Sequence, residues 1–100
     1  MIIPKTFTIC SQKYKVSLHE RIVHIEDDIE HECNGLCLPS SNEIRLNKLA
    51  QRDRLEQVYL HELIHAILAE MGHETYHDEC FVGSFSNMLH QVMTTSKGEL

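Results

Sequence analysis

The segment His61-Glu62-Leu63-Ile64-His65 constrains this chain more than any other part of its sequence, because it fixes both a local structure and a chemistry. A helix advances about 100° per residue, so histidines four positions apart lie one turn apart on the same face. Two imidazoles in that arrangement can bind a single Zn²⁺, and Glu62 lies beside that face, where it can accept a proton from a metal-bound water. The segment therefore predicts a helix that carries a zinc site.

The residues around this segment favour a helix over positions 55–71. Apolar residues recur there at helical spacing, and Gly72 follows as a typical helix stop. His61 and His65 share their stripe with apolar residues, so both are expected to face the interior or a cleft. Buried imidazoles need partners, which are either hydrogen bonds within a core or a metal ion. The adjacent Glu62 favours the metal.

The half of the chain before this helix predicts strands. Residues 6–10 and 13–18 alternate apolar and polar side chains and are expected to form a hairpin. Residues 36–38 and 42–47 are expected to form a second strand pair, with a turn between them. The intervening segment 19–32 is rich in acidic residues. Within it, residues 26–28 are expected to be a solvated loop or the rim of a short helix, and the rest of the segment has no clear pattern.

A second helix is predicted from about His77 to Thr94, where apolar residues form one face that can pack on the first helix and the sheet. Thr75, with Asp78 three residues later, resembles a capping box at its start. Residues 95–100 are expected to be a flexible tail. The whole chain is thus expected to form one α+β domain, in which a small antiparallel-type sheet from the N-terminal half packs on the motif helix and on a second C-terminal helix.

The composition is that of one small globular domain and argues against several classes of function. The 100 residues carry a net charge of −6 and their basic residues are scattered, which disfavours nucleic acid as a partner. No apolar run is long enough to span a membrane and the N-terminus does not resemble a secretion signal, so a cytoplasmic protein is expected. In that compartment free thiols are more common than disulfides, and the cysteines are Cys10, Cys33, Cys37 and Cys80.

A zinc site that performs chemistry usually has three protein ligands and one open position for water, so a third ligand is expected outside the motif. The candidates directly downstream are His73, His77, Asp78 and Glu79. Glu79 is favoured because it lies in the first turn of the predicted second helix, with apolar and small residues following at +3, +6, +7 and +10. His77 stays open as an alternative, and without any third ligand the helix would carry no peptidase site.

The motif helix and the residues after it resemble the gluzincin branch of zinc metallopeptidases, in particular the ImmA/IrrE-like proteins. The matching segments, which are similar to those of short proteins encoded by bacteriophages and prophages, are Leu60–Leu68 and Glu79–Val82, with residues 12–16 and 42–46 earlier in the chain. The resemblance implies a minimal zincin-like fold in which His61, His65 and Glu79 bind zinc. It also implies a metalloendopeptidase-like enzyme that hydrolyses a protein or peptide with Glu62 as general base, in the host cytoplasm if the protein is phage-encoded.

The chain is also similar to SprT-like proteases, in which the third ligand is a histidine in an H-G-x-x-F context. His77 keeps the spacing to Phe81 that this context requires, although Asp78 stands in place of the glycine. This second resemblance implies His77 as a ligand instead of Glu79. The metzincin pattern is absent, because Met71 occupies the position at which that pattern has a third histidine.

Two other classes of function are compatible with the sequence. One is a catalytically silent, zinc-stabilised protein-binding module of phage origin, and the other is an α+β domain without metal. Glu62 favours catalysis, because a purely structural zinc site needs no carboxylate beside the metal. For a peptidase, residues 43–46 are the predicted strand edge for the substrate, and the candidate oxyanion partners are Tyr76, His73 and His77. The histidines without a partner at ligand spacing are expected at the surface, and they are His19, His24, His31 and His90.

Overall fold

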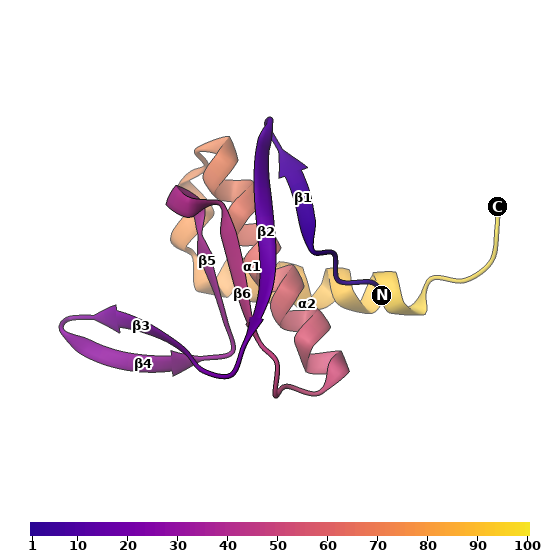
Figure 1. Cartoon of the computed structure of the whole chain (residues 1–100). Coiled ribbons are helices and arrows are strands. Elements are labelled where there is room, and N and C mark those ends of the chain that lie inside the picture. The colour runs from indigo at the N-terminus through magenta and orange to yellow at the C-terminus, as the bar shows by residue number, and fades with distance from the viewer.

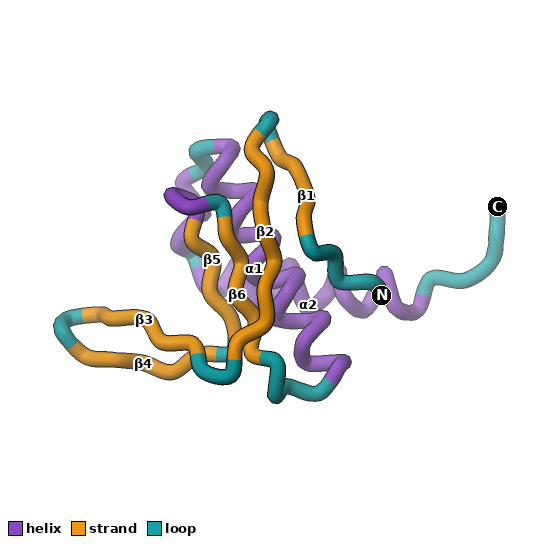
Figure 2. Tube along the Cα trace, in the orientation of Figure 1, coloured by secondary structure: helices purple, strands orange, loops and turns teal.

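A four-stranded sheet and two helices form the body of the molecule (Figure 1). The computed structural model describes residues 1–100. Along the chain the elements are β1 (Thr6–Ile9), β2 (Gln12–His19), β3 (Ile22–Glu26), β4 (Ile29–Cys33), β5 (Gly35–Leu38), the short 3₁₀ helix η1 (Pro39–Ser41), β6 (Glu43–Asn47), α1 (Arg52–Met71), the 3₁₀ helix η2 (Glu74–His77) and α2 (Glu79–Thr95). Strands dominate the first half and helices the second (Figure 2), so the predicted α+β class is confirmed.

The sheet has the strand order β1-β2-β6-β5, with antiparallel pairs at both sides and a parallel β2–β6 pair in the middle. Both predicted strand pairs, β1–β2 and β5–β6, are therefore confirmed. The first hairpin turns at Cys10 and Ser11, which have positive φ angles of 48° and 64°. Two successive left-handed residues match the right-handed twist of the strands that they join. The outer strands of this sheet are β1 and β5.

Strands β3 and β4 form a separate two-stranded sheet, which we call the arm (residues 22–33), and it projects away from the body (Figure 1). The solvated loop predicted at residues 26–28 is confirmed at Asp27 and Asp28, whereas the two strands on either side of it were not predicted. Asp27 and Asp28 make the tight turn, with φ angles of 53° and 62°. Of the ten strand residues in the arm only Ile22 is buried, because both faces of the arm meet solvent along most of its length. The polar and apolar alternation that identifies a half-buried strand is therefore missing.

Helix α1 lies against the sheet and supplies much of the core. Its residues Leu55, Tyr59, Leu60 and Ala66 are buried together with side chains of β2 and β6, which are Tyr14, Ile44 and Leu46. The hydroxyl of the fully buried Tyr14 donates a hydrogen bond to Glu70 Oε1 at 2.7 Å, and burial raises the pKa of that phenol. The predicted helix over 55–71 is confirmed, and so is its stop at Gly72, whose φ angle is 65°.

Helix α2 packs on α1 through Val82, which joins Ile64 and Leu68 in a second apolar cluster. Its first turn is capped by Asp78, whose Oδ1 accepts a hydrogen bond from the Phe81 N–H at 3.0 Å. The predicted capping box was wrong, because Thr75 lies in η2 and is separated from the start of α2. Residues 96–100 follow α2 as an exposed segment, and neither long helix combines the length and apolar character needed to cross a membrane.

A polar contact between the two helices involves a histidine that the sequence placed at the surface. The His90 side chain is buried, and its Nε2 lies 3.0 Å from Glu56 Oε1. The other carboxylate oxygen of Glu56 accepts a hydrogen bond from Arg52 at 3.1 Å. The hydrogen bond with His90 is the main cause of a lowered pKa at Glu56. The surface prediction was wrong for His90. Its partner Glu56 is 34 positions away in the chain, so the local sequence pattern does not predict their contact.

Candidate metal centre

The side chains of His61, His65 and Glu79 converge between the two helices. Glu79 Oε2 lies 3.0 Å from His61 Nε2, and Glu79 Oε1 lies 2.9 Å from His65 Nε2. One ligand atom from each residue lies within 4.8 Å of the other two. Helical periodicity places the two imidazoles on one face of α1, and the Asp78 cap fixes the first turn of α2, from which Glu79 extends. The structure thus brings together the three residues that the sequence favoured.

A backbone carbonyl group orients the ring of His65. Its Nδ1 lies 2.8 Å from the carbonyl oxygen of Tyr76 in η2. A carbonyl oxygen only accepts hydrogen bonds, so Nδ1 must carry the proton. In the neutral ring this leaves the lone pair on Nε2, the atom that faces Glu79. Metal-binding histidines are typically held in this way by an acceptor on their second nitrogen.

Glu62 lies next to these donors but points into a more enclosed environment. Only 9% of the residue is exposed. Burial raises the pKa of its carboxyl to about 7, the negative charge of Glu79 adds to this increase, and the backbone of Cys37 acts in the opposite direction. A carboxyl group with a pKa near neutrality can both accept and return a proton at physiological pH. Glu62 therefore has the properties of a general base and acid.

The three converging residues open onto a cleft of about 1010 Å³. Its walls are formed by one side of α1 and α2, by η2, by residues 34–37 and by residues 24–26 of the arm. The Glu79 side chain is 70% exposed, whereas that of His65 is 10% exposed, so the site is closed toward the core and open toward the cleft.

The strand beside the cleft is β5, and not the segment predicted from the sequence. Residues 43–46 belong to β6, which is paired on both sides by β2 and β5, so the prediction that they offer a free edge was wrong. Strand β5 ends the sheet on this side and lies against α1. A Cβ atom at Gly35 would overlap Val58 Cγ1 and lie 3.2 Å from Glu62 Cγ. Glycine therefore allows the free edge to approach Glu62.

The other candidate residues take different places. His77 lines the cleft with its ring against Tyr76, at 4.1 Å between centroids, but it is not among the three converging residues. His73 caps η2, where its Nδ1 accepts from the Thr75 N–H at 3.2 Å. Tyr76 lines the cleft, and burial raises the pKa of its phenol, so the hydroxyl stays protonated at neutral pH. All four cysteines are free thiols, as expected.

A second group of possible ligands, Asp53, Glu56 and His90, lies at the other end of the helix pair. Its central carboxylate already contacts two cations, Arg52 at 3.1 Å and the terminal ammonium group of Met1 at 3.3 Å. Positive charges at this distance oppose the binding of a metal ion. We therefore interpret this group as a network of ion pairs and hydrogen bonds that joins α1 to α2.

Comparison with known proteins identifies one family. The model of the SprT-like family matches residues 5–98, which is nearly the whole chain. Neither the curated proteins nor the solved structures contain a match. SprT-like domains are zinc metallopeptidase-like, in agreement with two histidines and a glutamate that converge on an open cleft. The chain belongs to the SprT-like family.

Proposed function

We propose that this protein is a zinc-dependent peptidase, in which His61, His65 and Glu79 hold the metal and Glu62 is the general base. The observation that carries the proposal is the convergence of two imidazole Nε2 atoms on one carboxylate, at 3.0 and 2.9 Å, beside a buried glutamate at the base of an open cleft. Membership of the SprT-like family supports the same class of activity.

The donor set fits Zn²⁺ by its chemistry. Two imidazole nitrogens and one carboxylate are the ligands of many catalytic zinc sites, which leave one position open. The hydrogen bond from His65 Nδ1 to the Tyr76 carbonyl keeps Nε2 available as a ligand. Glu79 is largely exposed and lines the cleft, so a metal held by these residues would be accessible from the cleft. A bound metal would also explain why two partly buried imidazoles lie so close to a single carboxylate.

The residues of the chain have separate roles in hydrolysis. When bound, Zn²⁺ supplies a Lewis acid that polarises the peptide carbonyl and acidifies a water molecule. Glu62 accepts the proton of the attacking water and passes it to the amine of the leaving group. Tyr76 is the best placed of the three oxyanion candidates, because its protonated hydroxyl can donate a hydrogen bond and His73 is engaged in capping η2.

The substrate we propose is an extended segment of a protein or peptide that pairs with β5. This strand has a free edge beside the cleft, and backbone pairing with a free edge binds extended peptides with little dependence on their sequence. The arm lies across the cleft from α1 and would contact the same segment through residues 24–26.

The two family resemblances imply different third ligands. The SprT-like context implies His77, whereas the geometry favours Glu79, because the carboxylate contacts both imidazoles and the His77 ring lies edge-on against Tyr76. Placement in the gluzincin branch depends on Glu79 being a ligand. The likeness to ImmA/IrrE-like proteins and a phage origin rest on the sequence resemblance alone and stay predictions.

Zinc content measured by elemental analysis tests the site. We expect about one zinc per wild-type chain, loss of zinc in His65→Ala and Glu79→Ala, and retention in the matched control His77→Ala. Loss in His77→Ala with retention in Glu79→Ala would move the third ligand to His77. Absence of zinc from the wild type, after incubation with ZnCl₂, would overturn the metal centre.

A quenched fluorescent peptide library tests the reaction separately. We expect cleavage by the zinc-loaded wild type and none after the metal is chelated. A protein that binds zinc stoichiometrically but cleaves no member of the library and no unfolded protein would be the catalytically silent binding module instead.

A further inference from the structure

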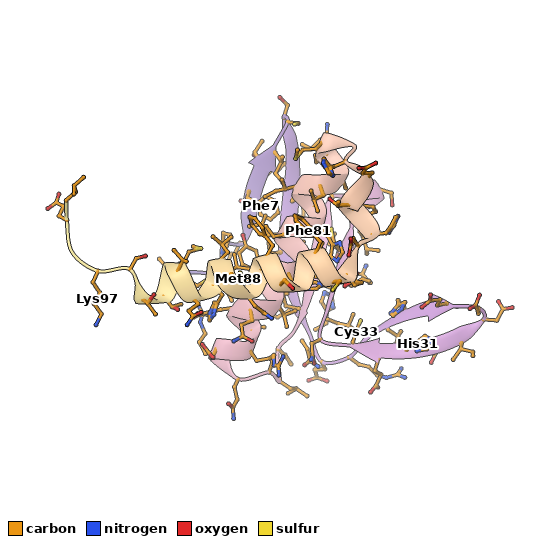
Figure 3. The ribbon with its side chains drawn as sticks, turned by 180° about the vertical axis from the view of Figure 1, so that it is seen from behind. Phe7, His31, Cys33, Phe81, Met88 and Lys97 are labelled. Atoms are coloured by element: carbon orange, nitrogen blue, oxygen red, sulfur yellow. The ribbon has the colours of Figure 1, made fainter.

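The outer face of α2 carries a continuous apolar stripe, which consists of Phe81, Phe85, Met88 and Val92. These side chains are 41%, 48%, 67% and 59% exposed. Their spacing of four, three and four residues keeps them within about 60° of one another around the helix, and the rings of Phe81 and Phe85 are 5.8 Å apart. No other element covers α2 on this side (Figure 3). Large apolar side chains rarely gather on a free surface without a partner.

The stripe is also free of charge. From Cys80 to Ser96 the chain has no Asp, Glu, Lys or Arg, although 24% of all residues are charged. An exposed amphipathic helix normally has charged residues on its solvent face. The uncharged face of α2 is therefore unusual for a surface that stays in water, and typical of one that is covered.

The stripe lies on the opposite side of α2 from the candidate metal centre. Glu79, Gly83 and Asn87 follow each other at intervals of four residues and line the cleft. At about 100° per residue, their side of the helix is roughly 170° from the centre of the stripe. A partner on the stripe would therefore leave the cleft open to a substrate.

We propose that the stripe binds the same stripe of a second copy of this chain, with the two α2 helices antiparallel. An antiparallel two-fold arrangement places Phe81 opposite Val92 and Phe85 opposite Met88 of the other copy, so large side chains meet smaller or more flexible ones. A parallel pair would instead set Phe against Phe. The antiparallel orientation also aligns the two helix dipoles favourably.

Charge selects this face over the rest of the surface. Each copy carries a net charge of −6, so two copies repel each other in most orientations. Residues 20–32 contribute strongly to this charge, because they contain one basic side chain, Arg21, against six acidic ones, which are Glu20, Glu26, Asp27, Asp28, Glu30 and Glu32. On the uncharged stretch of α2, two copies can meet without like charges facing each other at the contact.

The area is sufficient for a weak dimer. The exposed parts of the four stripe residues amount to about 430 Å² per copy, if a large apolar side chain exposes about 200 Å². Specific interfaces bury about 800 Å² per partner. The polar residues beside the stripe, such as Ser84 and Gln91, supply further area. We expect a dissociation constant in the micromolar range.

Sedimentation equilibrium from low to several hundred micromolar protein tests the dimer. We expect the wild type to dimerise with concentration, and Met88→Glu and Val92→Glu each to weaken the dimer by about tenfold or more. Leu49→Glu is the matched control, because Leu49 is 73% exposed but lies outside α2, and it should leave the dimer unchanged. A wild type that stays monomeric throughout, or that loses its dimer equally in Leu49→Glu, would overturn the proposal.

A pair of opposite charges tests the orientation without relying on a loss of association. Phe85→Lys and Met88→Glu should each dimerise more weakly than wild type when alone. When mixed they should form a heterodimer, because position 85 of one copy faces position 88 of the other only in the antiparallel pair. Dimers of either single variant as tight as wild type would show that the stripe is not the interface, and monomers in the mixture beside dimeric wild type would overturn the antiparallel register.

Discussion

The Nδ1 atom of His65 hydrogen-bonds to the carbonyl oxygen of Tyr76, eleven residues later, at 2.8 Å. This contact ties the motif helix to η2, the short segment that leads into α2. Because the chain reverses between Met71 and Glu79, the position of η2 sets both the ring of His65 and the start of the helix that carries Glu79. The turn at Gly72 is therefore part of the support of the site.

Replacement of Gly72 tests this turn. Its φ angle is 65°, and no atom lies within 4 Å of where a Cβ would stand, so the effect of a side chain is purely conformational. We expect Gly72→Ala to lower the free energy of unfolding by ~1 kcal/mol. Gly72→Asn should cost less, because asparagine tolerates left-handed backbone better than alanine. Urea denaturation of both variants measures the difference, and equal losses would contradict this explanation.

Replacement of Glu62 by glutamine tests the proposed general base. Glutamine keeps the size of the side chain but cannot accept the proton. We expect Glu62→Gln to retain zinc and the fold, and to lower kcat by about 10²–10⁴-fold. Hydrolysis of a peptide cleaved by the wild type measures kcat, and elemental analysis of the same sample measures zinc. A kcat within a fewfold of wild type would exclude Glu62 as the base.

Replacement of Gly35 tests the close approach of β5 to the motif helix. The Cβ of alanine would overlap Val58 and press on Glu62, so either β5 or the Glu62 side chain must move. We expect Gly35→Ala to destabilise the fold by about 1–3 kcal/mol and to reduce peptide cleavage while zinc stays bound. Gly83→Ala is a suitable control, because a Cβ there would lie 4.0 Å from His61 Cε1, an ordinary contact distance.

The Glu56–His90 contact predicts a dependence of stability on pH. The pKa of Glu56 is lower in the folded state, chiefly through the hydrogen bond with His90. Its contribution to stability is then present above the unfolded pKa of about 4.3, and is lost as the pH falls through the lower, folded pKa.

The difference in unfolding free energy between wild type and Glu56→Gln measures this contribution. We expect the difference to be larger at pH 6 than at pH 3, because pH 3 lies below the unfolded pKa of the Glu56 carboxyl, where the contribution is no longer fully present. His90→Asn should reduce the change, because it removes the main cause of the lowered pKa. A difference that does not vary with pH would contradict the proposed role of the contact.

Elements with a strong local signal were predictable from the sequence. The helix around His61 has an apolar period of 3.6 and a glycine stop, and the strand pairs alternate on a half-buried sheet, so local rules are sufficient for both. Glu79 was favoured because it lies in the first turn of the predicted second helix, with apolar and small residues at +3, +6, +7 and +10, and the structure places it beside both imidazoles. The sequence alone did not separate Glu79 from His77, because the two lie two residues apart; in the structure the His77 ring lies against Tyr76 and outside the three converging residues.

Other features depend on contacts that leave no local pattern. The arm is solvated on both faces, so its strands lack a buried period. His90 meets Glu56 across 34 positions, and the free edge at β5 depends on the order of strands in the sheet. The one local clue to that edge was Gly35, which fits a turn as well as a close approach to a helix. Only the tertiary structure shows that Gly35 makes a close approach to α1.

The placement of two proposed donors on α1 and the third on α2 has a thermodynamic consequence. A metal held there would cross-link two helices whose donors are 18 residues apart in the chain, so every unfolding event would have to release it. The free energy of unfolding would then increase with free zinc, by ~2.7 kcal/mol at a hundredfold excess over the dissociation constant. The melting temperature would rise with it. In a chain with so small a core, the supply of metal in its surroundings would govern how long the protein persists as well as whether it acts.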